Sequence, residues 1–323
     1  MYKEKILNLL RSSCSGFVSG EELARTCGIS RTMVWKHIKS LEREGFGIEA
    51  VPSQGYKIAS LPDILRQGDI KRGLGTRVIG KTVRLLSEVA STNTLAMELA
   101  ANGAPEGTVV IAETQTGGKG RLGRKWISPK GNLYLSVVLR PKIPMHKAPL
   151  ITLMGAVASA SAIKTTCGLE AGIKWPNDIL LSGRKVSGLL TEMSAEQDRI
   201  RHIVLGIGVD VNMEMGELPP EVRGLTTTLA AETGAKINRT VLLQQLLRDL
   251  ERRYRKFLKN DADILEEWKQ LDLTIGNRVT VSGAGERVEG LAQGVDNEGR
   301  LIVRLEDGTS RTVAAGDVTI IKE

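Results

Sequence analysis

Residues 115–126 read Q-T-G-G-K-G-R-L-G-R-K-W, and this stretch constrains fold and function more than any other part of the 323-residue chain. Glycine lets the backbone pass close over a ligand and disfavours a helix. The segment interleaves glycines with cations, at Gly117, Gly118, Lys119, Gly120, Arg121, Gly123, Arg124 and Lys125. Such fixed positive charge favours a loop that closes over phosphate or carboxylate, although a solvated surface loop has a similar composition. Trp126 adds a flat apolar face on which a base can stack.

Gly118, Gly120 and Gly123 of this loop also match the pattern G-x-G-x-x-G, which is the fingerprint of dinucleotide-binding folds. That fingerprint opens a helix directly after a strand. Here Pro129 and Gly131 follow and mark a turn, and Lys119 is not followed by Ser or Thr as in a P-loop. The sequence therefore argues against both of these nucleotide sites.

On both sides of the loop, from about residue 81 to residue 268, strand-like and helix-like segments interleave. This pattern predicts a domain with a mixed sheet. We expect strands at 83–86, 108–113, 133–139, 172–174, 185–193 and 203–211, and core helices at 147–166 and 239–259.

Residues 1–60 predict three short helices and a two-stranded wing, which is the winged helix-turn-helix pattern. The third helix begins with polar and basic residues suited to base edges and phosphates, namely Ser30, Arg31, Thr32, Trp35 and Lys36. These five residues are the candidate DNA contacts. A small helical domain that binds protein is the alternative.

After Thr274 the pattern changes to short alternating strands separated by the turns 282–285, 296–299, 306–308 and 316–317. Even spacing with such turns predicts a small barrel of about five strands. The expected class is α+β, with a DNA-binding domain at 1–62, a catalytic domain at 63–272 and the barrel at 273–323.

The composition narrows the class of protein. Lys and Arg number 45 against 37 Asp and Glu, a net charge of +8 that favours polyanionic partners. Three cysteines and three histidines, all scattered, suggest no disulfide framework, zinc site or Ser-His catalysis. We expect no signal peptide, no membrane span and a bacterial-type cytoplasmic location.

Four further polar segments accompany the loop: S-T-N at 91–93, K-W-P-N-D-I at 174–179, R-K-V-S-G-L-L-T-E at 184–192 and G-I-G-V-D-V-N at 206–212. Each could be only a helix cap or a strand-end turn. Taken together in this order, with the loop and with N-L-Y-L-S at 132–136, they resemble the biotin protein ligases. With the winged helix in front, the whole chain is similar to the bifunctional ligases that also repress the biotin operon.

The resemblance implies a catalytic domain related to class II aminoacyl-tRNA synthetases and lipoate ligases, followed by an SH3-like barrel. It implies ATP and biotin as substrates, with Mg²⁺ on the phosphates. Biotinyl-5′-AMP would form first, and the biotin would then pass to a lysine of the biotin carboxyl carrier protein of acetyl-CoA carboxylase. It also implies that the adenylate promotes a homodimer, which occupies a palindromic operator of the biotin operon.

The resemblance also assigns residues. Those implied to bind biotin are Ser91, Thr92, Asn93, Gln115, Lys119, Gly120, Arg121 and Lys185. Those implied to bind the adenylate are Arg124, Trp126, Asn177 and Asn212. Lys185 and Arg121 would stabilise the negative charge where the carboxylate meets the α-phosphate, and Asp178 would help to hold Mg²⁺.

Two positions depart from the family pattern. Lys119 stands where the family has arginine, and it keeps the charge but loses the planar fork. Asp210 stands where the family has asparagine, so adenine recognition could pass to Asn212 or to the backbone. Two other functions stay open, a repressor that senses ligand without catalysis and a ligase for lipoate or octanoate. The role of the barrel also stays open.

Overall fold

The computed structural model describes residues 2–13, 16–60, 63–197, 199–260, 262–283 and 286–321. It divides into two compact units, with the division between Ile64 and Leu65. The expected boundary at Pro62, Cys14, and Ala284 and Gly285 of one expected turn lie outside the described residues.

The first unit contains helices α1 (Tyr2–Ser12), α2 (Gly20–Cys27) and α3 (Arg31–Arg43) and the hairpin β1 (Gly47–Val51) and β2 (Gly55–Ser60). Serines cap both α2 and α3, since Ser19 accepts from the Glu22 amide and Ser30 from the Met33 amide. Gly28 ends α2 in the left-handed conformation that glycine adopts without strain. The helices share a buried core that includes Ile6, Leu23, Val34, Ile38 and Leu41. The predicted winged helix-turn-helix is confirmed.

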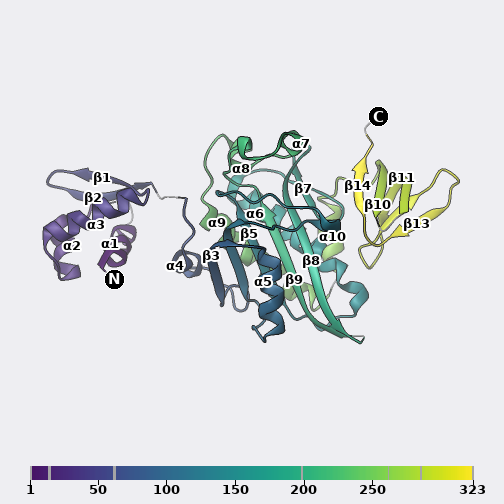
Figure 1. Cartoon of the computed structure of the whole chain (residues 1–323), viewed down its shortest axis with the longest axis horizontal. Coiled ribbons are helices and arrows are strands. Elements are labelled where there is room, and N and C mark those ends of the chain that lie inside the picture. The colour runs from purple at the N-terminus through teal and green to yellow at the C-terminus, as the bar shows by residue number, and fades with distance from the viewer. Residues whose placement is uncertain are drawn as a thin grey trace. The chain divides into compact units, whose positions relative to one another are not determined.

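The second unit is built on a seven-stranded mixed sheet in the order β3-β4-β5-β9-β8-β7-β6 (Figure 1). Its strands are β3 (Val83–Val89), β4 (Val109–Gln115), β5 (Leu133–Leu139), β6 (Gly172–Lys174), β7 (Asp178–Leu181), β8 (Arg184–Glu196) and β9 (Arg199–Val209). Only the pair β3 and β4 is parallel among the paired strands described, because α5 (Thr92–Ala101) crosses over between them.

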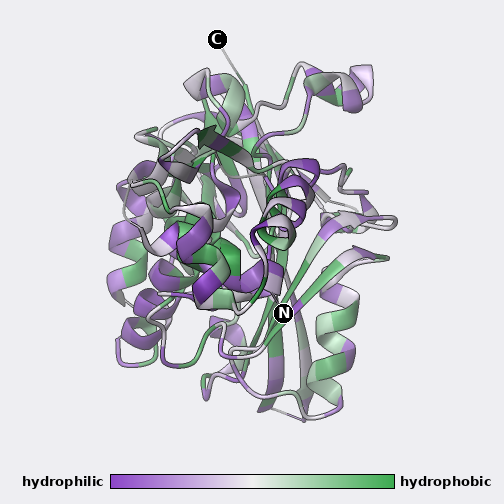
Figure 2. Cartoon of the chain, turned by 90° about the vertical axis from the view of Figure 1, so that its left-hand side faces the viewer, coloured by the Kyte–Doolittle hydropathy of each residue, from purple (hydrophilic) through white to green (hydrophobic). Residues whose placement is uncertain are grey.

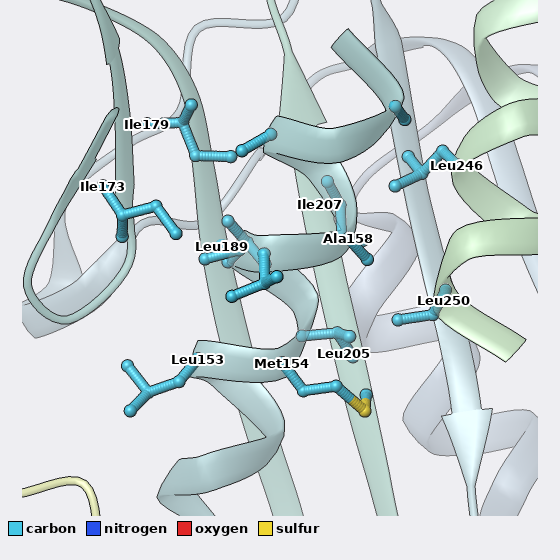
Figure 3. Packing of buried hydrophobic residues seen from close by; sticks show 14 of the residues in the cluster. Leu153, Met154, Ala158, Ile173, Ile179, Leu189, Leu205, Ile207, Leu246 and Leu250 are labelled. Atoms are coloured by element: carbon cyan, nitrogen blue, oxygen red, sulfur yellow. The ribbon is translucent and has the colours of Figure 1, made fainter. Parts of the chain in front are cut away.

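Helices cover both faces of this sheet, and the alternation of side chains along the strands explains how. Val110, Val138 and Val204 pack with Ala96 and Ala100 of α5 on one face. Residues next to them in sequence face the other way and pack with α6 (Pro149–Cys167) and α9 (Arg239–Phe257). Figure 3 shows side chains of α6 packed with those of the sheet and of α9 in one cluster. In Figure 2 hydrophobic residues follow the long strands, and hydrophilic residues lie on outer helical turns.

By length and composition, one helix among the described residues, Met145–Cys167, could cross a membrane. That span includes α6, and 67% of its apolar window is buried inside the molecule. The helix is apolar because the sheet, α9 and α10 (Ala262–Lys269) surround it.

A five-stranded antiparallel sheet follows, here called the C-terminal sheet, in the order β13-β12-β11-β10-β14. Its strands are β10 (Arg278–Gly283), β11 (Glu286–Val295), β12 (Leu301–Arg304), β13 (Ser310–Val313) and β14 (Asp317–Ile320). Its buried residues belong to the same hydrophobic cluster as the central sheet. The buried Trp175 fixes the junction, because its indole N–H donates to the Gly299 carbonyl over 2.9 Å.

The predicted α+β class and the predicted long elements are confirmed. The sequence prediction missed β7, α10 and the short helices α4 (Gln67–Lys71), α7 (Pro220–Arg223) and α8 (Leu229–Thr233). Elements of four or five residues are too short to show a helical or a strand period.

Candidate functional site

A cavity of about 130 Å³ opens in the second unit where the glycine-rich loop meets the central sheet. Its lining brings together residues that are far apart in sequence. Of the sequence-predicted site residues, Ser91, Thr92, Asn93, Gln115, Lys119, Gly120, Arg121, Arg124, Trp126, Asn177, Asp178 and Lys185 line it. Asn212 is not among the lining residues.

Neutral polar groups form one end of the cavity. The Thr92 amide at the start of α5 donates to Oε1 of Gln115 at the end of β4, over 2.8 Å. The Gln115 amide nitrogen in turn donates to the Ser128 hydroxyl over 3.0 Å. Ser91 caps α5 through a 3.4 Å contact with the Thr94 amide, so it serves as a helix cap and also faces the cavity. These groups suit a ligand that carries both N–H and C=O groups.

Asn93 faces the same cavity, but its amide group is already committed. The side-chain oxygen accepts from Ser136 over 2.6 Å, and the nitrogen donates to the Leu190 carbonyl and to Glu192. Gly206 leaves the room for it, since a Cβ there would lie 2.1 Å from the Asn93 oxygen. The geometry makes Asn93 a group that holds α5 against the sheet.

The glycine-rich loop folds as a small hairpin. The Gly120 amide donates to the Arg124 carbonyl over 2.7 Å, and the Trp126 amide donates to the Gly118 carbonyl over 2.9 Å. Gly118 is required by close approach, since a Cβ there would lie 2.3 Å from the Trp126 carbonyl oxygen. The hairpin therefore holds its cations on a defined backbone over the cavity.

Two arginines of this hairpin contact the C-terminal sheet. Arg121 donates to the Asn177 side-chain oxygen over 3.0 Å and to the Gly316 carbonyl over 3.2 Å. Arg124 forms an ion pair with Asp317. Burial lowers the pKa of Arg121, while the charges of Asp317 and Asp178 oppose that shift. The residues just before and at the start of β14 thus form part of the site.

Lys185, near the start of β8, lies in a cluster with a carboxylate. Its ammonium is 2.5 Å from Asp178, whose other oxygen is 3.2 Å from the ammonium of Lys174. Burial by itself would raise the pKa of Asp178, but the two lysines outweigh burial and hold the pKa below its usual range. The carboxylate stays charged and holds the Lys185 ammonium at the cavity wall.

This cluster does not fit a protein-held metal ion. The Asp178 carboxylate is taken up by two ammonium groups. Among the described residues no group of three or more His, Cys, Asp or Glu could hold a metal. Any Mg²⁺ at this site would therefore arrive with nucleotide phosphates as part of the substrate.

Trp126 closes the floor of the cavity by lying across two glycines of the sheet. A Cβ at Gly188 of β8 or at Gly208 of β9 would lie 2.7 Å from the indole ring. The Lys185 ammonium lies 5.1 Å from the centre of the same ring, which is within range of a cation–π contact.

Residues 206–208 of the last motif, at 206–212, line the cavity, whereas Asp210 and Asn212 are not among the lining residues. Asn212 pairs with the backbone of Ile237, donating to its carbonyl and accepting from its amide. Asp210 is 4% exposed, and its carboxylate accepts a hydrogen bond from the side-chain nitrogen of Asn132 over 3.1 Å. Burial raises the pKa of Asp210 to about 8, against an opposing effect of Lys185.

In the first unit, the candidate DNA contacts lie on one exposed surface of α3 and its cap. Ser30, Arg31, Thr32, Trp35 and Lys36 are all exposed, and the large Trp35 side chain is 51% exposed. Val34 and Ile38, on the opposite side, are buried in the core of the unit. This helix can place polar and basic side chains in a DNA groove.

Family models match along the chain. The model of the biotin/lipoate A/B protein ligase family matches residues 85–210, a helix-turn-helix model matches 3–57, and the model of the biotin protein ligase C-terminal domain matches 274–320. A bifunctional ligase/repressor BirA from Bacillus spizizenii is 39% identical over 97% of each chain. The chain belongs to the biotin protein ligase family.

Other members of the family agree with this assignment. The bifunctional ligase/repressor BirA of Escherichia coli is 31% identical over 94% of this chain and 93% of its own. The structure of the Aquifex aeolicus biotin protein ligase, solved with biotin and ATP, has a TM-score of 0.64 and 28% identity. It covers 75% of this chain and 100% of its own.

Sequence reasoning missed several residues of the site. Gly316 and Asp317 lie about 190 residues beyond the loop that they contact, and no local pattern marks them. Gly206 and Gly208, by contrast, are two apart on one strand, and this spacing signals a face kept clear for close approach.

Proposed function

We propose that this chain is an ATP-dependent biotin protein ligase and a biotin-responsive transcriptional repressor. One observation supports the ligase activity most directly. A single cavity has neutral polar groups at Thr92 and Gln115 and cations at Arg121 and Lys185. Biotin presents the matching groups, a ureido ring with donors and an acceptor at one end and a carboxylate at the other. The family and its bifunctional relatives support the same reading.

The reaction has two steps. A carboxylate oxygen of biotin attacks the α-phosphorus of ATP, and pyrophosphate leaves with the electrons of the broken P–O bond. The amine of a carrier-protein lysine then attacks the acyl carbon, loses its proton, and AMP leaves. Neither step needs a nucleophile from the ligase, so positioning and neutralisation of charge supply the catalysis.

The cavity residues divide between the two halves of the acyl-adenylate. Ser91, Thr92 and Gln115 bind the ureido ring, with Asn93 fixing the helix that carries two of them. Lys119, Gly120, Arg121 and Lys185 surround the carboxylate and the α-phosphate. Arg124, Trp126 and Asn177 lie beside the nucleotide, while Asn212 supports it from outside the cavity. Asp178 positions Lys185, and Mg²⁺ enters with the ATP phosphates.

Residues 1–62, within the first unit, form the operator-binding domain; residues 63–272 carry catalysis, and residues 273–323 support the loop. The exposed α3 enters the major groove of a biotin-operon operator. Formation of the adenylate promotes a homodimer whose two-fold symmetry matches a palindromic operator. The protein acts in the cytoplasm, where ATP and its carrier protein occur.

Mass spectrometry of a carrier domain tests the ligase. After incubation with biotin and Mg·ATP, one lysine should gain the mass of a biotinyl group, and pyrophosphate should be released. Tight biotin binding with neither product would favour a repressor without catalysis. Transfer of lipoate or octanoate in preference to biotin would favour the lipoate-type ligase.

DNA binding tests the repressor, and variants of α3 separate the two functions. Arg31→Ala and Lys36→Ala should weaken DNA binding and leave biotinylation unchanged, because their side chains are exposed on α3. Loss of both activities together would contradict this division of roles. Unchanged DNA binding in the α3 variants would favour a protein-binding role for the first unit.

A further inference from the structure

The second unit has a groove that the ligase reaction does not use. It runs along α9 and is bounded on its other side by the segment before β3, with Gly75 and Thr76 in its lining. Its volume is about 530 Å³. Among the described residues its lining has five cations and one carboxylate, namely Arg248, Arg252, Arg255, Lys256, Lys259 and Glu251.

The single carboxylate interacts with one of these cations, Arg255, but is bound mainly to backbone amides. Glu251 is 6% exposed, and its two oxygens accept from the backbone amides of Arg77, Val78 and Ile79 at 2.6–2.8 Å. It therefore serves to fasten the segment before β3 onto α9. Asp249, the other acid of the helix, is also buried, at 4% exposed.

The cations, in contrast, face outward. Arg252, Arg255, Lys256 and Lys259 are exposed. Arg252 pairs with Asp249, and Lys256 with Asp263 and Glu267. Arg255 interacts with the buried Glu251 through its charge. Positive charge is thus concentrated on the solvent face of α9, and negative charge on its inner face.

The spacing of the cations suits a duplex. Arg248, Arg252, Arg255 and Lys259 recur every three or four residues, so they form one row along the helix. At 1.5 Å per residue the row is roughly 16 Å long. That length can reach phosphates on both sides of a groove roughly 12 Å wide. Guanidinium groups also match phosphate oxygens in a bidentate geometry.

The connection to the first unit favours DNA over an acidic protein as the partner. Only six residues separate the end of β2 at Ser60 from the start of α4 at Gln67. A duplex held by α3 is therefore tethered to the second unit by a short connector, and a second contact would form at a high effective concentration. Five basic residues, Arg66, Lys71, Arg72, Arg77 and Lys81, lie between residues 61 and 81, against two acids, Asp63 and Asp69.

We infer that the α9 groove binds the phosphate backbone of DNA and gives the ligase unit its own contact with the duplex. This inference rests on the proposed repressor function. The contact carries no sequence information, because phosphates are the same at every base pair. It strengthens binding and makes it more sensitive to salt, through the release of counterions.

The test uses the full chain and a labelled random-sequence duplex several helical turns long, with biotin and ATP present. Fluorescence anisotropy measures affinity over a range of salt concentrations. Arg255→Gln with Lys259→Gln should reduce the slope of log affinity against log salt by about 1–2, since each phosphate contact contributes about 0.9. Pyrophosphate release should not change, because neither residue lines the cavity.

The matched control removes two other exposed cations, Lys142→Gln with Arg287→Gln, and should keep the wild-type slope. A groove variant with the wild-type slope would overturn the inference. An unchanged slope together with a raised KM for the carrier protein would assign the groove to an acidic protein surface. If the wild-type chain bound an operator duplex but no random-sequence duplex, the inference would be overturned and the repressor function would stand; if it bound neither, the proposed repressor function itself would fail.

Discussion

The guanidinium of Arg121, in the glycine-rich loop, donates over 3.2 Å to the carbonyl oxygen of Gly316, which directly precedes the last strand of the C-terminal sheet. The neighbouring Arg124 pairs with Asp317. The loop that covers the cavity is thus held from two sides, by its own hairpin bonds and by a module that follows it by almost 200 residues. This relationship gives the C-terminal sheet a role in positioning the loop.

Removal of the Asp317 charge should loosen the loop. Asp317→Asn breaks the ion pair with Arg124, whose side chain is 69% exposed, so the loss of stability should stay below about 1 kcal/mol. The loop backbone should nevertheless open more often, and trypsin should cleave after Arg121 and Arg124 more quickly. Asp307→Asn, on an exposed turn of the same module, is the control and should leave the cleavage rate unchanged. Equal rates for all three proteins would refute the positioning role.

Loss of the Lys185 ammonium should slow adenylation. Lys185→Ala leaves the developing charge without its facing cation, and removal of one such donor costs roughly 10²–10³ in rate. Biotin-dependent pyrophosphate release measures the effect. Arg184→Ala, next in sequence but outside the cavity lining, should retain nearly full activity. A Lys185→Ala rate close to wild type would exclude Lys185 from the chemistry.

A methyl group at Gly208 should displace the indole of Trp126. The added Cβ would lie 2.7 Å from the ring, so the end of the loop must shift. A displacement of about 1 Å can cost up to roughly 10² in rate, so we expect kcat/KM for biotin to fall at least about tenfold. Gly224→Ala is the matched control, since nothing lies within 4 Å of its added Cβ. Equal kinetics for the two variants would show that Trp126 need not rest on β9.

Asp210 should make stability depend on pH. Its pKa is raised to about 8 in the folded protein, mainly by burial, whereas an exposed Asp titrates near 3.9. Between these values the folded state holds a proton that the unfolded state has released, so stability falls as pH rises and levels off above about pH 8.

Asp210→Asn cannot ionise and can still accept from Asn132. Its free energy of unfolding relative to wild type should therefore rise between about pH 5 and about pH 9, by on the order of 4 kcal/mol. Urea unfolding at several pH values measures this difference. Asp307→Asn, at an exposed carboxyl whose pKa is lowered by Thr309, should show no such gain at high pH. A difference for Asp210→Asn that does not change with pH would contradict the account.

Much of the fold could be predicted because its long elements have clear periods. The nearly continuous apolar runs at 133–139 and 203–211 and the apolar helix at 147–166 are all buried, as their composition predicts. The site could be predicted only from motifs in which several polar, charged or glycine residues stand next to one another in the sequence. S-T-N, the glycine-rich loop and R-K-V-S-G each bring cavity residues into one short segment.

The remainder depends on side-chain contacts that no periodic pattern encodes. The prediction assigned Asp178 to Mg²⁺, but the charge of Asp178 is taken up by Lys174 and Lys185, which the strands β6, β7 and β8 bring to it. The same is true of Asp317, and of Asn93, whose partner Glu192 lies 99 residues away. Pairings of this kind follow from sheet order.

A crystal structure of the full chain with biotinyl-5′-AMP is the most direct test of the central claim. The account predicts the ureido ring beside Thr92 and Gln115, the phosphate between Arg121 and Lys185, and the loop closed over both. An adenylate bound elsewhere, with the loop directed into solvent, would contradict it.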